Sequence, residues 1–207
     1  MIIRRTCSHE KCNELTVLNT DTCARHFRGD VREAIEKLLR STDYLVRVSF
    51  DGLNLSDISF ASHTFHGCTF TGTTLSRCDF HDTVFELTFV DFAEITRCRF
   101  TDARVRASTF AGSDIRECTF ENATLLQVNF NGAKIRDLTI RSSEFLDCRL
   151  ITADIRDTEF SDCNLKGSDF SNSRRVNVRY PTCNVFQTAG IRGERKYAAI
   201  NIPGLDL

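Results

Sequence analysis

The sequence lacks several features that would assign it to a common functional class. It has no apolar run long enough to span a bilayer, and residues 1–7 lack the apolar core of a secretory signal. It also lacks a charge excess, because 27 Lys and Arg residues stand against 28 Asp and Glu residues, for a formal net charge of −1. We therefore expect a cytoplasmic protein that enters no membrane and has no basic face for direct binding of nucleic acid.

Signatures of catalysis are missing as well. The sequence contains no glycine-rich phosphate-binding loop, and His63, His66 and His81 are scattered without a serine or cysteine placed as a nucleophile. These absences predict that the protein is not an enzyme.

The dominant pattern is a large apolar residue at every fifth position. From Phe50 to Phe170 all 25 such positions are Phe, Leu, Ile or Val, without insertion or break. A helix would spread a five-residue period around its circumference, and a strand would alternate it between two faces. The remaining solution is a chain that turns a corner every five residues and points one side chain per corner at a common axis. The pattern therefore predicts a solenoid.

A second column of residues supports this interpretation. Two positions before each large residue, 19 of 25 residues are Ala, Ser, Thr or Cys, which lets small and bulky side chains interleave in a narrow lumen. Similar segments recur 20 residues apart, as at 115–117 and 135–137, and Gly112 and Gly132 share this spacing. We expect four five-residue sides per turn and about six turns between Phe50 and Phe170.

Segments such as residues 153–157 (ADIRD) and 163–167 (CNLKG) resemble the repeating unit of the pentapeptide repeat family. The resemblance covers residues 45–185 and implies an all-β fold, a right-handed quadrilateral parallel β-helix. It assigns no function, because members of the family have many roles.

The flanking sequences complete a division into four regions: residues 1–28, 29–44, 45–185 and 186–207. Asp30 and Glu33 form a capping-box pair before an apolar stripe, which predicts a helix that caps the first turn or, alternatively, binds a partner. Residues 186–207 are apolar without a helical period. We expect them to cap the last turn or to pair with another chain, which would give a homodimer.

The N-terminal region resembles short zinc knuckles. Its Cys7, Cys12, Cys23 and His26 have the spacing Cys-x4-Cys-x10-Cys-x2-His, which suits one tetrahedral structural zinc ion. So short a segment cannot bury enough apolar surface to fold alone, and the metal would supply the missing stability. Four unconnected residues on a flexible arm are the alternative, and His9 is a less favoured substitute ligand.

The other seven cysteines occupy the small inward column: Cys68, Cys78, Cys98, Cys118, Cys148, Cys163 and Cys183. A thiol in this column is a compact apolar group, and parallel side chains in a packed stack have poor disulfide geometry. We expect buried, reduced thiols, with metal or redox chemistry as the alternative.

Two outer faces carry distinctive charge patterns. On one, Arg116 and Arg136 stand beside Glu117 and Asp137, and we expect these neighbours to pair. The other has two bases, Arg99 and Arg141, against six acids: Asp79, Asp82, Asp102, Glu121, Glu159 and Asp162. Such a stripe attracts basic grooves. The family resemblance implies a specific case, because quinolone-resistance members are thought to imitate DNA and bind type II topoisomerases such as DNA gyrase.

Four apolar residues are expected on the outside of one corner: Val84, Leu87, Phe89 and Phe92. If exposed, they form a protein-binding patch. A local kink that turns one phenylalanine inward is the alternative. Together these patterns predict a non-enzymatic interaction or scaffold protein with a structural zinc site, and DNA mimicry of a type II topoisomerase is the second hypothesis.

Overall fold

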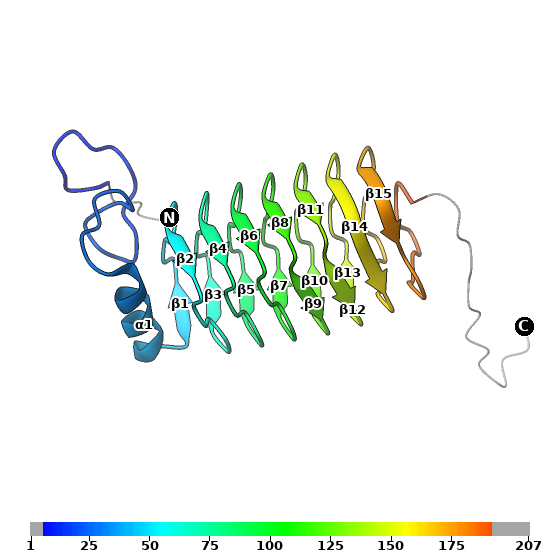
Figure 1. Cartoon of the computed structure of the whole chain (residues 1–207), viewed down its shortest axis with the longest axis horizontal. Helices are drawn as coiled ribbons and strands as arrows, with labels where there is room; N and C mark the ends of the chain where they lie inside the picture. The colour runs from blue at the N-terminus through cyan, green and yellow to red at the C-terminus, as the bar shows by residue number, and fades with distance from the viewer. Residues whose placement is uncertain (1–5, 192–207) are drawn as a thin grey trace, which may run out of the picture.

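The computed structural model describes residues 6–191, which form a parallel β-solenoid of about seven turns with a single short helix (Figure 1). The helix, α1, spans Val31–Ser41. The strands are β1 (Tyr44–Val46), β2 (Asn54–Ser56), β3 (Thr64–His66), β4 (Thr74–Ser76), β5 (Val84–Glu86), β6 (Glu94–Thr96), β7 (Arg104–Arg106), β8 (Asp114–Arg116), β9 (Thr119–Glu121), β10 (Thr124–Leu126), β11 (Lys134–Arg136), β12 (Thr139–Arg141), β13 (Glu144–Leu146), β14 (Asp154–Ser161) and β15 (Arg174–Arg179). Among the described residues, no helix has the length and apolarity needed to cross a membrane.

The turns stack into four walls. Wall A is the six-stranded sheet β1-β3-β5-β7-β10-β13, and wall B stacks β2, β4, β6, β8, β11 and the first half of β14. Wall C contains β9, β12 and the second half of β14, which continues around the corner from wall B. Wall D is held by single parallel bridges, such as Thr69–Phe89 and Phe89–Thr109. The predicted quadrilateral parallel β-helix is therefore confirmed.

Residues 20 positions apart lie directly above one another on every wall. Phe65 pairs with Phe85 on wall A, and Ile115 pairs with Ile135 on wall B. The rings of Phe100 and Phe120 stack with their centroids 4.7 Å apart and their planes 4° from parallel. The predicted turn of 20 residues is confirmed.

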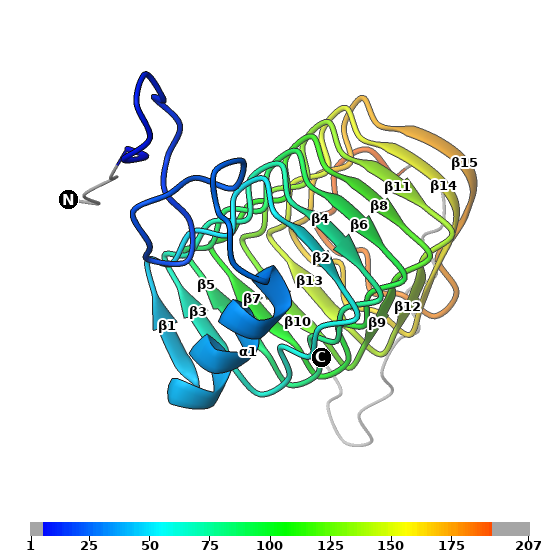
Figure 2. The same ribbon diagram turned by 60° about the vertical axis from the view of Figure 1, so that its left-hand side comes forward.

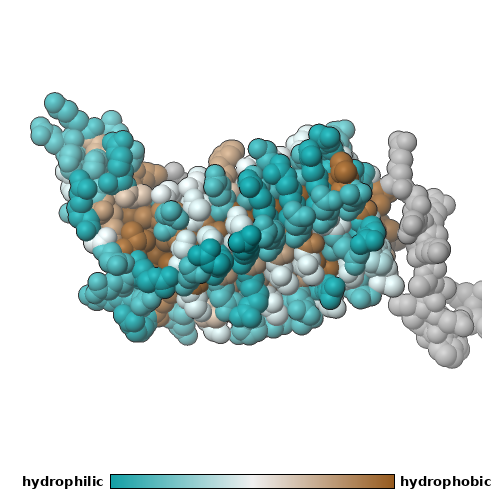
Figure 3. All heavy atoms as spheres, in the orientation of Figure 1, coloured by the Kyte–Doolittle hydropathy of each residue, from teal (hydrophilic) through white to brown (hydrophobic). Residues whose placement is uncertain are grey.

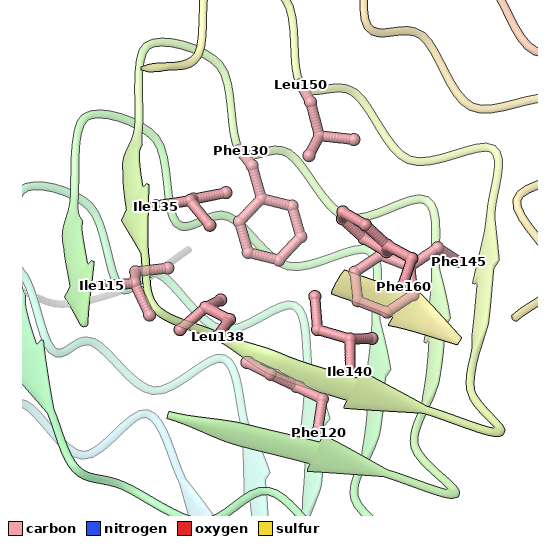
Figure 4. A pocket seen from close by; sticks show the side chains of 9 residues that line it. All are labelled: Ile115, Phe120, Phe130, Ile135, Leu138, Ile140, Phe145, Leu150 and Phe160. Atoms are coloured by element: carbon pink, nitrogen blue, oxygen red, sulfur yellow. The ribbon is translucent and has the colours of Figure 1, made fainter. Parts of the chain in front are cut away.

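The predicted inward column fills the lumen. All 25 large residues from Phe50 to Phe170 are at most 3% exposed, and Leu45 extends the column by one position toward the N-terminus. Stacked rings run along wall C until Ile140, where the smaller side chain interrupts them and leaves a small apolar gap (Figure 4). Burial of each large apolar side chain stabilises the fold by about 1.5–3 kcal/mol, so the lumen is the main source of stability.

The small inward column has a second role besides fitting the lumen. The Thr73 hydroxyl donates a 2.9 Å hydrogen bond to the Phe50 carbonyl oxygen, 23 residues earlier, and the Ser113 hydroxyl donates in the same way to Val90 at 2.6 Å. Each bond joins a buried side chain to a backbone carbonyl of the preceding turn, and the Phe50 carbonyl also accepts from the Leu53 amide. Serine, threonine and cysteine therefore supply a donor that alanine lacks.

The helix α1 and the N-terminal segment, defined here as residues 6–29, close the first turn (Figure 2). The Asp30 carboxylate caps α1 by accepting a 3.0 Å hydrogen bond from the Glu33 amide. Ile35 of α1 and Val17 of the N-terminal segment are at most 1% exposed and join the core of the solenoid. The helix therefore packs as a cap, as one of the two alternatives predicted.

At the other end the repeat continues beyond its expected boundary at residue 185. The Ala189 amide donates to the Ser168 carbonyl, and Arg175, which stands where a large apolar residue is expected, donates to the Gly190 carbonyl at 2.6 Å. Residues 186–191 thus complete the last turn. The rest of the predicted C-terminal cap or association segment lies outside the described residues.

Candidate functional site

The N-terminal segment brings Cys7, Cys12, Cys23 and His26 into one cluster. Their ligand atoms all lie within 4.8 Å of one another. His26 Nδ1 is 3.4 Å from Cys7 Sγ and 3.5 Å from Cys23 Sγ, and Cys12 Sγ is 3.9 Å from Cys23 Sγ. A tetrahedral zinc site with ordinary bond lengths separates its ligand atoms by about 3.5–3.8 Å. The cluster is therefore close enough to bind one metal ion.

Short backbone hydrogen bonds hold these side chains in place. The Cys7 amide donates to the Glu14 carbonyl. Within tight turns, the Cys12 amide donates to the His9 carbonyl and the His26 amide to the Cys23 carbonyl. The segment is anchored where Leu18 donates a 2.7 Å bond to Ser49 of the first turn. Figure 3 shows apolar residues gathered where this segment meets the first turns, while most of the visible solenoid surface is hydrophilic.

The protonation behaviour of the cluster follows from its partial burial. Burial raises the pKa of the Cys23 thiol to about 11, whereas for Cys7 the opposing hydrogen bonds from the Cys23 and His9 amides outweigh burial and lower the pKa. Burial and the neighbouring His9 ring lower the pKa of His26, so its imidazole is neutral near pH 7 and able to ligate. The His9 and His26 rings stack with centroids 3.9 Å apart, a contact that the sequence did not suggest.

The apolar corner residues keep the regular register, and no kink turns them inward. Phe92 is 70% exposed, Leu87 48% and Phe89 41%, while Val84 is half-buried. Phe92 occupies a corner position with φ of +56°, where neighbouring turns carry Gly72 and Gly112 with φ near +65°. Leu87, Phe89 and Phe92 are therefore all exposed within one turn at wall D, and these three residues are named here the aromatic patch.

The six predicted acidic residues lie along wall C, where arginines contact three of them and His81 contacts a fourth. Arg179 continues this wall above Glu159, and Arg104 reaches across from wall A, so both add to the two bases counted from the sequence. The Arg99 guanidinium also holds the pKa of Asp79 below its ordinary value. The contacts are Asp79–Arg99 at 2.6 Å, Glu159–Arg179 at 2.8 Å, Asp102–His81 at 3.5 Å and Asp82–Arg104 at 3.9 Å.

The arginines of wall B form ion pairs, but the expected pairing of Arg116 with Glu117 is wrong. Arg116 pairs with Asp114 at 2.5 Å rather than with Glu117, which instead accepts from Arg97 at 2.7 Å. The reason is the pleat, because positions two apart on a strand point to the same side and adjacent positions do not. Wall B thus carries a series of ion pairs, but each arginine pairs with a different carboxylate from the one expected.

The inward cysteines are enclosed in the lumen. Cys68, Cys78, Cys98, Cys118, Cys148 and Cys163 are buried, and Cys183 in the last turn is half-buried. Burial raises the pKa of Cys68 to about 11 and of Cys148 to about 12, which keeps these thiols protonated and poorly nucleophilic. The lumen gap beside Ile140 has only apolar lining residues, so no catalytic group faces it.

Comparison with known proteins agrees with the repeat geometry. The profile described as "Pentapeptide repeats (8 copies)" matches residues 44–82, and the "Pentapeptide repeat region" profile matches residues 113–188, together more than half of the 207 residues. The chain belongs to the pentapeptide repeat family. Its turn of four pentapeptides and its stacked lumen fit this family, which is not typically enzymatic.

Solved structures of pentapeptide repeat proteins share this fold. A trypsin-treated variant of QnrB1, a plasmid-mediated fluoroquinolone resistance protein, is 18% identical with a TM-score of 0.59, and the alignment covers 72% of this chain and 83% of that one. A second variant gives 17% identity and a TM-score of 0.57, with coverage of 72% and 84%. No curated protein sequence matches this chain.

Proposed function

We propose that this pentapeptide repeat protein is a non-enzymatic scaffold that binds a protein partner through the aromatic patch. The supporting observation is Phe92, 70% exposed on a rigid wall beside Leu87 and Phe89. Single exposed apolar residues are common, but a group containing two phenylalanines is typical of interaction surfaces. A β-solenoid holds such a patch without rearrangement, so binding orders few additional side chains.

A capture experiment tests this function. The immobilised protein is compared with the F89S/F92S variant in native lysate, and retained proteins are quantified by mass spectrometry. We expect at least one protein to be retained about tenfold less by the variant, a loss of about 1.4 kcal/mol of binding free energy. An F186S variant, which removes an exposed phenylalanine far from the patch, serves as the control. Equal retention by all three proteins would contradict the proposal.

We further propose that Cys7, Cys12, Cys23 and His26 bind one structural zinc ion. The separations of 3.4, 3.5 and 3.9 Å support a tetrahedral set of three thiolates and one imidazole. Four protein ligands leave no open coordination position, so the ion would stabilise the N-terminal segment and supply no catalysis. Protein purified without chelator is expected to contain close to one zinc per chain, and the C7S/C12S variant close to none.

Modulation of a type II topoisomerase by DNA mimicry is the second candidate. It is supported by the acids of wall C and by the QnrB1-like fold, and weakened by the neighbouring Arg99, Arg104 and Arg179. Purified gyrase is assayed for supercoiling with increasing amounts of the protein. Inhibition that disappears when Glu121 and Asp162 are changed to Lys would support mimicry, whereas unchanged supercoiling at micromolar protein would dismiss it.

A further inference from the structure

Wall D is almost free of charge over four successive turns. The outer surfaces of residues 67–72, 87–92, 107–112 and 127–132 consist of small, amide, hydroxyl and apolar residues, named here the neutral section. Its one charged residue is Asp91, whose Oδ1 accepts hydrogen bonds from the Thr109 hydroxyl and the Ala111 amide. In a chain with 27% charged residues, so long a neutral surface is suited to being covered.

One edge of this section carries a ridge beside a notch. The Phe92 ring leans over Gly112 of the next turn, so that a Cβ at Gly112 would lie 2.6 Å from Phe92 Cε1. One turn farther, a Cβ at Gly132 would meet no atom within 4 Å. A phenyl ridge therefore stands next to bare backbone.

The opposite edge of wall D carries opposite charges at its two ends. Arg47 leans toward the second turn, with its Cγ 3.6 Å from the position of a Cβ at Gly67. Asp147 leans in the same direction, and its carboxylate covers Gly167. Along this edge the level of Gly67 is thus positive and the level of Gly167 is negative, while Asp51, Arg149 and Asp169 lie elsewhere on the end turns.

We propose that wall D is an interface with a second copy of this chain, packed antiparallel about a two-fold axis that runs along the strand direction. This inference rests on the proposed function, since it names the partner of the aromatic patch. Rotation about this axis reverses the order of the turns, so the first turns of one copy face the last turns of the other. It leaves the strand direction unchanged, so each edge of wall D faces the same edge of the second copy. An axis between the turns 107–112 and 127–132 sets the Phe92 ridge into the Gly132 notch of the second copy. The same axis brings Arg47 opposite Asp147 of the second copy.

The self-complementarity of wall D favours a second copy over an unrelated protein. A two-fold interface must match itself, and a neutral centre, a ridge beside a notch on one edge, and opposite charges at the two ends of the other edge are three features that do so. Wall D has all three features about a single axis. With about 4.8 Å between turns, the contact from residues 47–52 to residues 167–172 would be about 29 Å long. Walls B and C carry paired charges along their length instead.

The test measures dissociation of the full chain by sedimentation velocity from about 1 to 100 μM. We expect wild type to form dimers and F92G to raise the dimer dissociation constant at least about tenfold. Glycine already occupies this corner in other turns, so F92G keeps the fold. G132N, which fills the notch with a residue that tolerates positive φ, is expected to weaken the dimer as well.

Exchange of the two charges is the most specific test of the interface. R47D and D147R are each expected to weaken the dimer, and the R47D/D147R double variant to restore it, because the exchanged charges meet again across the two-fold. Thermal unfolding of each variant checks its fold, and F186S is the control for an exposed phenylalanine on another wall. Dimers unaffected by F92G and by the charge variants would overturn the interface. Monomeric wild type at 100 μM would also overturn it, yet leave partner capture by the aromatic patch intact.

Discussion

The solenoid and the N-terminal segment differ in how much of their sequence is buried. In the solenoid every turn adds the same inward pairs, and each of the 25 large residues is at most 3% exposed. In residues 6–29 only Cys7, Val17 and Cys23 are buried. A repeating core distributes stability over many equivalent contacts, whereas the N-terminal segment buries few side chains and is hydrogen-bonded to the first turn at Ser49.

Removal of the proposed zinc ion would separate the two regions most strongly. Structural zinc contributes on the order of 10 kcal/mol in short peptides, so its loss should unfold residues 6–29. We expect hydrogen exchange to accelerate throughout this segment in the C7S/C12S variant, while amides in β4 to β13 stay protected. C118S, which changes a thiol inside the lumen, is the control and should leave the zinc content unaltered. Equal protection of residues 6–29 in both variants would refute the contrast.

A cavity in the lumen should destabilise the solenoid and leave the N-terminal segment with its zinc. Phe100 stacks between Phe80 and Phe120 with centroids 4.9 and 4.7 Å away, and F100A would leave a cavity that neighbouring turns cannot fill. We expect the free energy of unfolding to fall by about 3–5 kcal/mol in urea titrations. Zinc content should stay at the wild-type level. A loss below about 1 kcal/mol would show that the turns collapse around the missing ring.

The hydroxyl column offers a smaller and more specific test. T73V keeps the volume of the side chain but removes one of the two donors to the Phe50 carbonyl, which keeps the Leu53 amide, so the free energy of unfolding should fall by about 0.5–1.5 kcal/mol. The matched control is T139V on the outside of β12, where the residue is exposed and the change should have little effect. Similar losses in both variants would mean that the lumen hydrogen bonds add nothing beyond packing.

The smallest effect expected is a decline in solenoid stability in acid. Hydrogen bonds from Arg99 and Arg116 lower the pKa values of Asp79 and Asp114 in the folded protein. These carboxylates therefore stabilise the fold above their unfolded pKa of about 3.9, and this contribution is lost as pH falls through the lower folded values. Urea titrations at pH 7 and pH 3 should show the decline, reduced in D79N. A stability that is unchanged between these pH values would disprove it.

The sequence predicted the solenoid because its information is local. A five-residue period decides which side chain faces inward, and stacking then follows from the need to pair backbone groups every 20 residues. The grouping of Cys7, Cys12, Cys23 and His26 could be predicted for a related reason, since short spacings leave little freedom to place four ligands apart. By contrast, the hydrogen bonds from Thr73 and Ser113 to residues 23 positions earlier left no signal beyond a preference for small residues.

What only the tertiary structure decided is how side chains lie on the outside. Arg116 forms an ion pair with Asp114 and not with Glu117. The Phe92 ring lies over Gly112 of the next turn, and Arg179 forms an ion pair with Glu159 on wall C. An inward side chain has one dry lumen to enter, so its period alone fixes its place. An outward side chain has solvent and several neighbours of similar energy around it, and the pleat of its own strand together with the stacking of turns decides which neighbour it contacts.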